Sequence, residues 1–170
     1  LLGPAGLDLL AEQKAMDAAL KPAPRDIEGL RIRLSTEVDT TTGEPSRNVM
    51  ALLKGSDPVL CREVVVLGAH YDHLGVAPDG KGFNGADDNA SGTAVVLALA
   101  EAMAASPRRP RRSVMFILFS GEERGLLGSA WQVAHPTAVP LADMAAMINL
   151  DMVGRYRPEE FMIGGVGTAA

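Results

Sequence analysis

The sequence has 170 residues, of which 47% are hydrophobic and 22% charged, and its net charge is −5 at pH 7. The length suits one folded domain, and the negative charge argues against a nucleic acid or an anionic membrane as a partner. No apolar run reaches the roughly 18 residues that a membrane helix needs. The basic run at residues 107–112 lacks interleaved aromatic side chains, which is typical of a solvated loop. A single cysteine, Cys61, excludes an intrachain disulfide bond.

The first part of the chain is predicted to hold a helix and two strands. Residues 7–20 are rich in Ala and Leu and stop before Pro22, which predicts a helix. Residues 30–38 alternate apolar and polar side chains, and residues 48–54 follow after a turn-like stretch. We therefore expect these two segments to form an antiparallel strand pair.

The rest of the chain alternates strands and helices. Continuous apolar runs predict three buried strands, at residues 63–69, 113–119 and 144–150, and a fourth strand is expected to begin at residues 161–164. Helices are predicted at residues 91–105, which are apolar on nearly all faces, and at residues 126–134. This is the pattern of an α/β fold, in which sites lie at the carboxyl ends of the strands.

Histidine and acidic side chains follow these strands. His70 ends the first buried strand, and Asp72 lies two residues on, so in an extended segment both side chains lie on the same side. The Asp72 carboxylate could then accept a hydrogen bond from the imidazole and fix its tautomer. Imidazole and carboxylate groups that converge on one sheet edge are ligands that zinc ions require.

Two adjacent acids, Asp87 and Asp88, lie just before the apolar helix. Such a pair is commonly solvated, with one acid capping the helix. Here Gly85 and Gly92 remove bulk from the segment, so it can approach another group closely. A carboxylate that bridges two cations would meet that description.

Acids also follow the second and third buried strands. Glu122 and Glu123 would face opposite ways on an extended segment, so one could bind a metal while the other takes a proton from bound water. Asp151 lies between the apolar Leu150 and Met152, where a carboxylate is costly to bury without a cation or hydrogen bonds.

Together these motifs resemble the di-zinc exopeptidases of peptidase family 28, which include bacterial aminopeptidases and, more distantly, glutamate carboxypeptidase II. The matching motifs are His70-Tyr-Asp72, Gly85-Ala-Asp-Asp88-Asn-Ala-Ser-Gly92, Gly121-Glu-Glu123 and Asn149-Leu-Asp151. The resemblance implies a three-layer α/β/α fold around a mixed, largely parallel sheet. Residues 1–29 would form an N-terminal helix and linker, and residues 30–170 the catalytic domain, incomplete at its C-terminus.

The resemblance also assigns roles to residues of this chain. Four metal ligands are implied: His70, Asp88, Glu123 and Asp151. Asp88 would bridge two zinc ions, one completed by His70 and Asp151 and the other by Glu123. Glu122 and Asp72 are the implied catalytic residues, Glu122 as general base and acid and Asp72 as the carboxylate that orients His70. The peptide bond between Asp88 and Asn89 would be cis.

The implied activity is hydrolysis of the N-terminal residue of a peptide substrate by a water that two zinc ions activate. The family implies an exported protein, although the chain starts at Leu1 and carries no signal peptide. Alternatives are a carboxypeptidase, a glutaminyl cyclase relative with one zinc, and a non-catalytic binding relative.

The histidines depart from the family pattern, which has a further His ligand downstream of the last acid. His70, His73 and His135 all precede Asp151. The ion held by Asp88 and Glu123 would then lack its third protein ligand, and truncation beyond Ala170 is the expected reason. We expect His73 to belong to the loop and His135 to be exposed.

Overall fold

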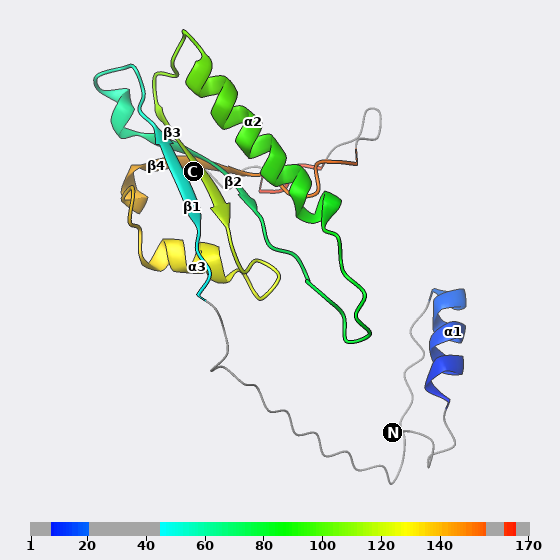
Figure 1. The fold of residues 1–170 in the computed structure, drawn as a ribbon. Helices are drawn as coiled ribbons and strands as arrows, with labels where there is room; N and C mark the ends of the chain where they lie inside the picture. The colour runs from blue at the N-terminus through cyan, green and yellow to red at the C-terminus, as the bar shows by residue number, and fades with distance from the viewer. Residues whose placement is uncertain (1–7, 21–44, 156–161, 166–170) are drawn as a thin grey trace. The chain divides into compact units, whose positions relative to one another are not determined.

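The fold is known from a computed structural model that describes residues 8–20, 45–155 and 162–165 (Figure 1). Contacts group the chain into two units, residues 1–43 and 44–170. In the first unit, helix α1 (Leu9–Ala19) confirms the predicted helix. It begins at Asp8, whose Oδ1 accepts the N–H groups of Leu10 and Ala11 at 2.9 and 3.2 Å. The strand predicted at residues 30–38 and the predicted boundary at residue 29 lie outside the described residues.

The second unit is built on a four-stranded sheet in the order β1-β3-β2-β4. Its strands are β1 (Val49–Leu53), β2 (Val64–His70), β3 (Ser113–Phe119) and β4 (Met144–Asn149). Both β3 and β4 run parallel to β2, while β1 is antiparallel to β3. The sheet is therefore mixed and largely parallel, as the family resemblance implies, and β1 finds its described partner in β3.

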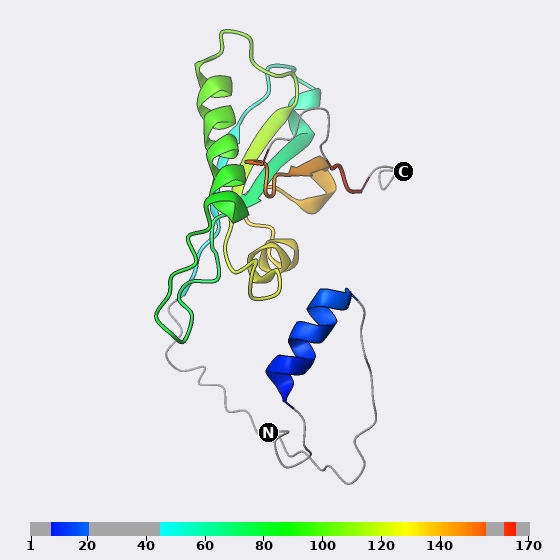
Figure 2. The same ribbon diagram turned by 90° about the vertical axis from the view of Figure 1, so that its right-hand side faces the viewer.

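Apolar side chains fill both faces of this sheet. Helix α2 (Gly92–Ala105) lies along one face, where its Val96 packs with Leu67, Ala69, Val114 and Phe116 (Figures 1 and 2). On the other face Val139 packs with Val64, Val66, Met115, Ile117 and Phe119. Val139 follows helix α3 (Leu127–Ala134). The two central strands are thus buried on both sides, which explains their continuous apolar sequences.

One face of α2 packs against the sheet, while Val95 and Leu97 are 38% and 56% exposed, because side chains return to the same face of a helix only about every 3.6 residues. The predicted burial of the third apolar strand was wrong. Strand β4 was expected to be buried, yet Met147 and Ile148 are 51% and 53% exposed. It lies at the edge of the sheet that the described residues form, so its outer side is open. Residues 162–165 form no strand.

Short turns complete the described chain. They are η2 (Leu60–Arg62), η3 (Ala86–Ser91) and η4 (Leu141–Asp143). The peptide bond between Asp88 and Asn89, inside η3, is cis, as the family resemblance implies. Among the described residues, each helix is too short or too polar to cross a lipid bilayer.

The central strand β3 should carry much of the stability of the second unit. Ile117 is 0% exposed, so Ile117→Ala should leave a cavity and lower the free energy of unfolding by about 2–5 kcal/mol in a urea titration. Leu52→Ala is the matched control, since Leu52 on β1 is 51% exposed. Equal losses for the two variants would contradict this account of the core.

Candidate metal centre

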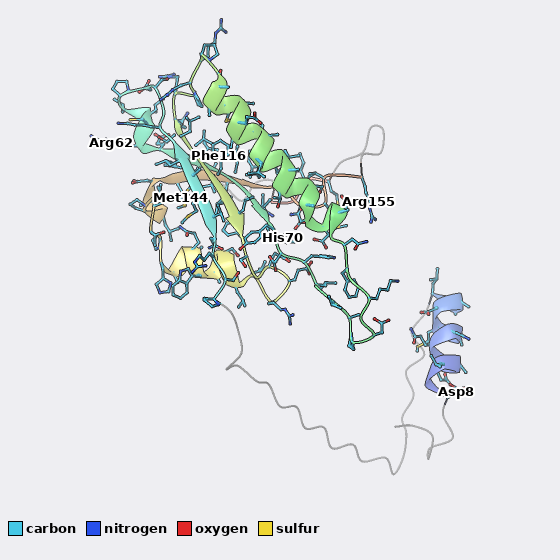
Figure 3. All side chains as sticks on the ribbon, in the orientation of Figure 1. Asp8, Arg62, His70, Phe116, Met144 and Arg155 are labelled. Atoms are coloured by element: carbon cyan, nitrogen blue, oxygen red, sulfur yellow. The ribbon has the colours of Figure 1, made fainter. Side chains whose placement is uncertain are left out.

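The parallel strands bring the predicted ligands to one edge of the sheet. In the register of the sheet His70 pairs with Phe119, and Gly68 pairs with Asn149. The residues that follow β3 and β4 therefore emerge beside the end of β2, where His70 lies close to the start of α2 (Figure 3). This is the edge at which α/β folds carry their sites.

His70 lies at the centre of this edge. Its side chain is 2% exposed, and Nε2 lies 3.2 Å from Asp88 Oδ1. The same nitrogen lies 3.6 Å from Asp151 Oδ2 and 4.0 Å from Glu122 Oε2. Three carboxylates from three separate loops thus surround one imidazole nitrogen, and their mutual repulsion favours a bound cation.

Three of the four predicted ligands lie close enough together to take part in binding metal. His70, Asp88 and Glu123 each offer one ligand atom, and these atoms all lie within 4.8 Å of one another. The fourth, Asp151, joins them through its approach to His70 Nε2. Imidazole nitrogen and carboxylate oxygen are the donors that zinc takes in open sites, so the residues present fit zinc.

Asp72 is placed differently from the prediction. The nearest hydrogen-bonding partner of His70 Nδ1 is the backbone carbonyl of Asp72 at 3.1 Å, while the Asp72 carboxylate is 3.8 Å away. That carboxylate instead accepts the N–H of Glu122 at 3.1 Å and the N–H of Glu123 at 3.4 Å. One residue therefore orients the imidazole through its backbone and holds the Glu122–Glu123 turn through its side chain.

Glu122 stands in a setting that suits a proton carrier. Burial raises the pKa of its carboxyl group, the nearby His70 opposes this, and the carboxylates of Glu123, Asp151 and Asp72 raise the pKa further. A carboxyl group whose pKa moves toward neutral pH can both take up and release a proton.

His73 lies in the loop after β2, as expected, and contacts one of the predicted ligands. Its Nδ1 lies 2.7 Å from Glu123 Oε1, and its ring meets Phe83 edge-on at 6.3 Å between centroids. The sequence does not predict this contact with Glu123, because the two residues are 50 positions apart in the chain. His135 is exposed, as predicted, and stacks on Trp131 with ring centroids 3.9 Å apart.

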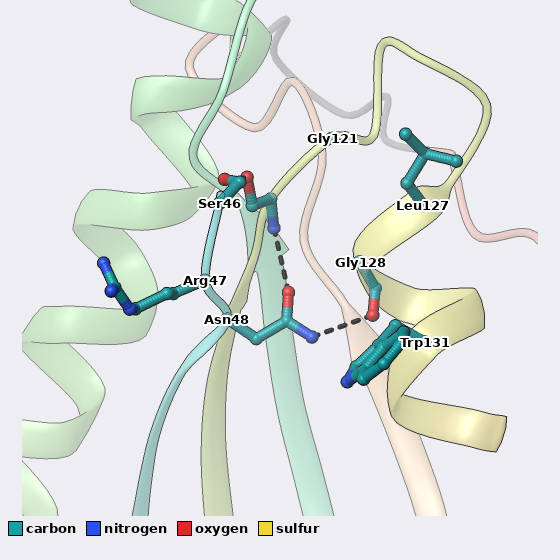
Figure 4. Close-up of a pocket in the computed structure, with 8 residues that line it drawn as sticks. Ser46, Arg47, Asn48, Gly121, Leu127, Gly128 and Trp131 are labelled. Atoms are coloured by element: carbon teal, nitrogen blue, oxygen red, sulfur yellow. Dashed lines mark hydrogen bonds between the residues drawn. The ribbon is translucent and has the colours of Figure 1, made fainter. Parts of the chain in front are cut away.

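A pocket of about 330 Å³ borders the backbone that leads into Glu122 (Figure 4). Asn48 lies between its walls: Nδ2 donates to Gly128 O at 2.8 Å, and Oδ1 accepts the N–H of Ser120 at 3.1 Å. The residues around Asn48 are Ser46, Arg47, Ser120, Gly121, Leu127, Gly128 and Trp131. Asn48 thereby ties the start of β1 to α3 and to the turn that carries the two glutamates.

Known proteins resemble this chain in sequence and, for one of them, in fold. Aminopeptidase YwaD of Bacillus subtilis (strain 168) is 35% identical over 113 residues, which are 66% of this chain and 23% of that protein. A probable zinc metalloprotease of Pyrenophora teres f. teres is 44% identical over 115 residues, again 66% of this chain and 23% of that protein. The crystal structure of BSAP, a zinc aminopeptidase from Bacillus subtilis, matches with a TM-score of 0.51 and 36% identity. The match covers 63% of this chain and 24% of BSAP.

The chain spans about a quarter of the length of these relatives. The model of peptidase family M28 matches residues 48–170, which hold the whole sheet and every predicted ligand. The chain therefore belongs to peptidase family M28.

Proposed function

We propose that the protein to which this chain belongs is a zinc-dependent aminopeptidase that removes N-terminal residues from peptides with the help of two zinc ions. The observation that carries the proposal is the approach of Asp88, Asp151 and Glu122 to one nitrogen of His70. Membership of family M28 supports peptide hydrolysis, and the relatives named as aminopeptidases favour that activity over a carboxypeptidase.

In this proposal His70, Asp88 and Asp151 hold one zinc ion, and Asp88 with Glu123 holds the other. Zinc lowers the pKa of a bound water and polarises a carbonyl group. The sequence has no histidine after Asp151, and the histidine nearest to Glu123 in the described residues is His73.

Glu122 is the proposed general base and acid. Its carboxylate would take a proton from the attacking water and then deliver it to the leaving amine. Two observations support this role. Glu122 is the glutamate of the pair that lies outside the compact group of His70, Asp88 and Glu123, and burial raises its pKa.

Export of the protein, which the family resemblance implies, is also part of the proposal.

The role of Glu122 is tested by Glu122→Gln, which keeps the shape of the side chain and removes its basicity. Cleavage of a dipeptide with a free N-terminus should fall by about 10²–10⁴-fold, with zinc content by elemental mass spectrometry unchanged. An N-acetylated dipeptide should resist the unaltered protein. The control is Glu101→Gln, since Glu101 lies exposed on α2. Loss of zinc in Glu122→Gln would instead make Glu122 a ligand.

A second prediction concerns Asp72 as the residue that holds the two glutamates. Asp72→Asn keeps only one of the two acceptor oxygens that meet the N–H groups of Glu122 and Glu123. Zinc affinity, measured by competition with a chelating dye, should fall by about 10–100-fold. The matched control is Asp79→Asn, in an exposed loop where Asp79 accepts the N–H of Lys81. Equal zinc affinities for the two variants would show that the Asp72 side chain does not support metal binding.

A further inference from the structure

The loop that carries Asp151 is held by side chains from the segment that carries Asp88. Three consecutive backbone N–H groups, those of Met152, Val153 and Gly154, each donate to a side-chain oxygen of that segment. The acceptors are Asn89 Oδ1 at 3.3 Å, Ser91 Oγ at 3.1 Å and Asp87 Oδ1 at 2.9 Å. Every second residue of this segment, namely Asp87, Asn89 and Ser91, thus directs its side chain to the loop that carries Asp151.

The attachment continues on the other side of Asp151. Asn89 Nδ2 donates to the carbonyl oxygen of Leu150 at 2.9 Å, so hydrogen bonds reach the chain both before and after Asp151. Asn89 is 2% exposed, and its Oδ1 also accepts the N–H of Gly92 at 2.9 Å. An acceptor that is buried and shared in this way has few alternative positions.

The three side chains also support one another. Ser91 Oγ donates to the backbone carbonyl of Asp87 at 2.6 Å while it accepts from Val153, which fixes the direction of its hydroxyl hydrogen. The second carboxylate oxygen of Asp87 lies 2.9 Å from Arg155 Nε, just beyond the loop.

The two segments are in direct contact. A Cβ on Gly92 would overlap the carbonyl oxygen of Leu150, and a Cβ on Gly154 would lie 2.8 Å from Asp87 Oδ1. Glycine at these two positions therefore permits the close approach that the hydrogen bonds require.

We propose that Asp87, Asn89 and Ser91 are positioning residues that fix the place of Asp151 relative to Asp88, so that the two carboxylates keep their spacing before any metal binds. The inference rests on the proposed function, in which Asp88 and Asp151 hold zinc together. Without a cation the two carboxylates repel each other, and the four bonds to residues 150–154 oppose the separation.

The test compares four variants of the full chain. Ser91→Ala removes a neutral acceptor, and Asp87→Ala removes both an acceptor and a charge. Asp87→Asn removes the charge and keeps the oxygen that meets Gly154. The control is Ser129→Ala, whose hydroxyl donates to Leu126 O at the start of α3. Two quantities are measured: amide hydrogen exchange of residues 152–154 by NMR without metal, and zinc affinity by competition with a chelating dye.

Ser91→Ala and Asp87→Ala should speed exchange at residues 152–154 and weaken zinc binding by about 10-fold or more. In Asp87→Asn the exchange rates and the zinc affinity should stay close to those of the unaltered chain. Ser129→Ala should change neither of them. A purely structural role for the three residues would alter exchange and leave zinc affinity unchanged. That result would overturn the inference.

Two further outcomes would also overturn it. Equal loss of affinity in Asp87→Asn and Asp87→Ala would show that the charge of Asp87, and not its hydrogen bond, acts on the metal. Unaltered exchange in both Ser91→Ala and Asp87→Ala would show that the loop is held by other contacts. Failure of the unaltered chain to bind zinc would count against the proposed function, while the exchange rates would still decide whether these side chains hold the loop. If Ser91→Ala does not fold, the comparison of Asp87→Ala with Asp87→Asn is enough to test the inference.

Discussion

The parallel pairing of β2 with both β3 and β4 is the constraint on which the whole site depends. It places the carboxyl ends of three strands at one edge, and each end passes directly into a loop that carries acids. His70 is buried at the central end, and Asp151, Glu122 and Glu123 reach the same place from the two flanking strands. A register shift of one residue would turn His70 to the other face of the sheet and separate it from the carboxylates.

Several carboxylates gather at this edge of the sheet, and their mutual repulsion costs free energy unless it is compensated. Part of the cost is met inside the chain, because Asp72 accepts two backbone N–H groups and Asp87 accepts one and pairs with Arg155. Asp88 and Asp151 instead direct an oxygen toward the imidazole of His70. The acids therefore divide into those that hold the backbone and those that face the centre, and the second group is the one that fits a metal ion.

The sequence was sufficient for strands β1 to β4 and for the residues that gather at their ends. Continuous apolar runs identify β2 and β3, because burial on both faces leaves no alternation, and histidine and acids directly after such runs mark the edge. It was insufficient where the outcome depends on neighbours distant in the sequence. The exposure of Met147 follows from the position of β4 in the sheet, and the partners of Asp72 and His73 follow from the turn at Glu122–Glu123. Such contacts have no periodic signal in the chain.

Anomalous X-ray diffraction from crystals grown with zinc, with data on both sides of the zinc absorption edge, tests the central claim most directly. The account predicts an anomalous peak about 2.0–2.2 Å from His70 Nε2 and from one carboxylate oxygen each of Asp88 and Asp151, and a second peak that shares Asp88 and contacts Glu123. Zinc peaks only at other positions, or no peak within bonding distance of His70, would contradict it.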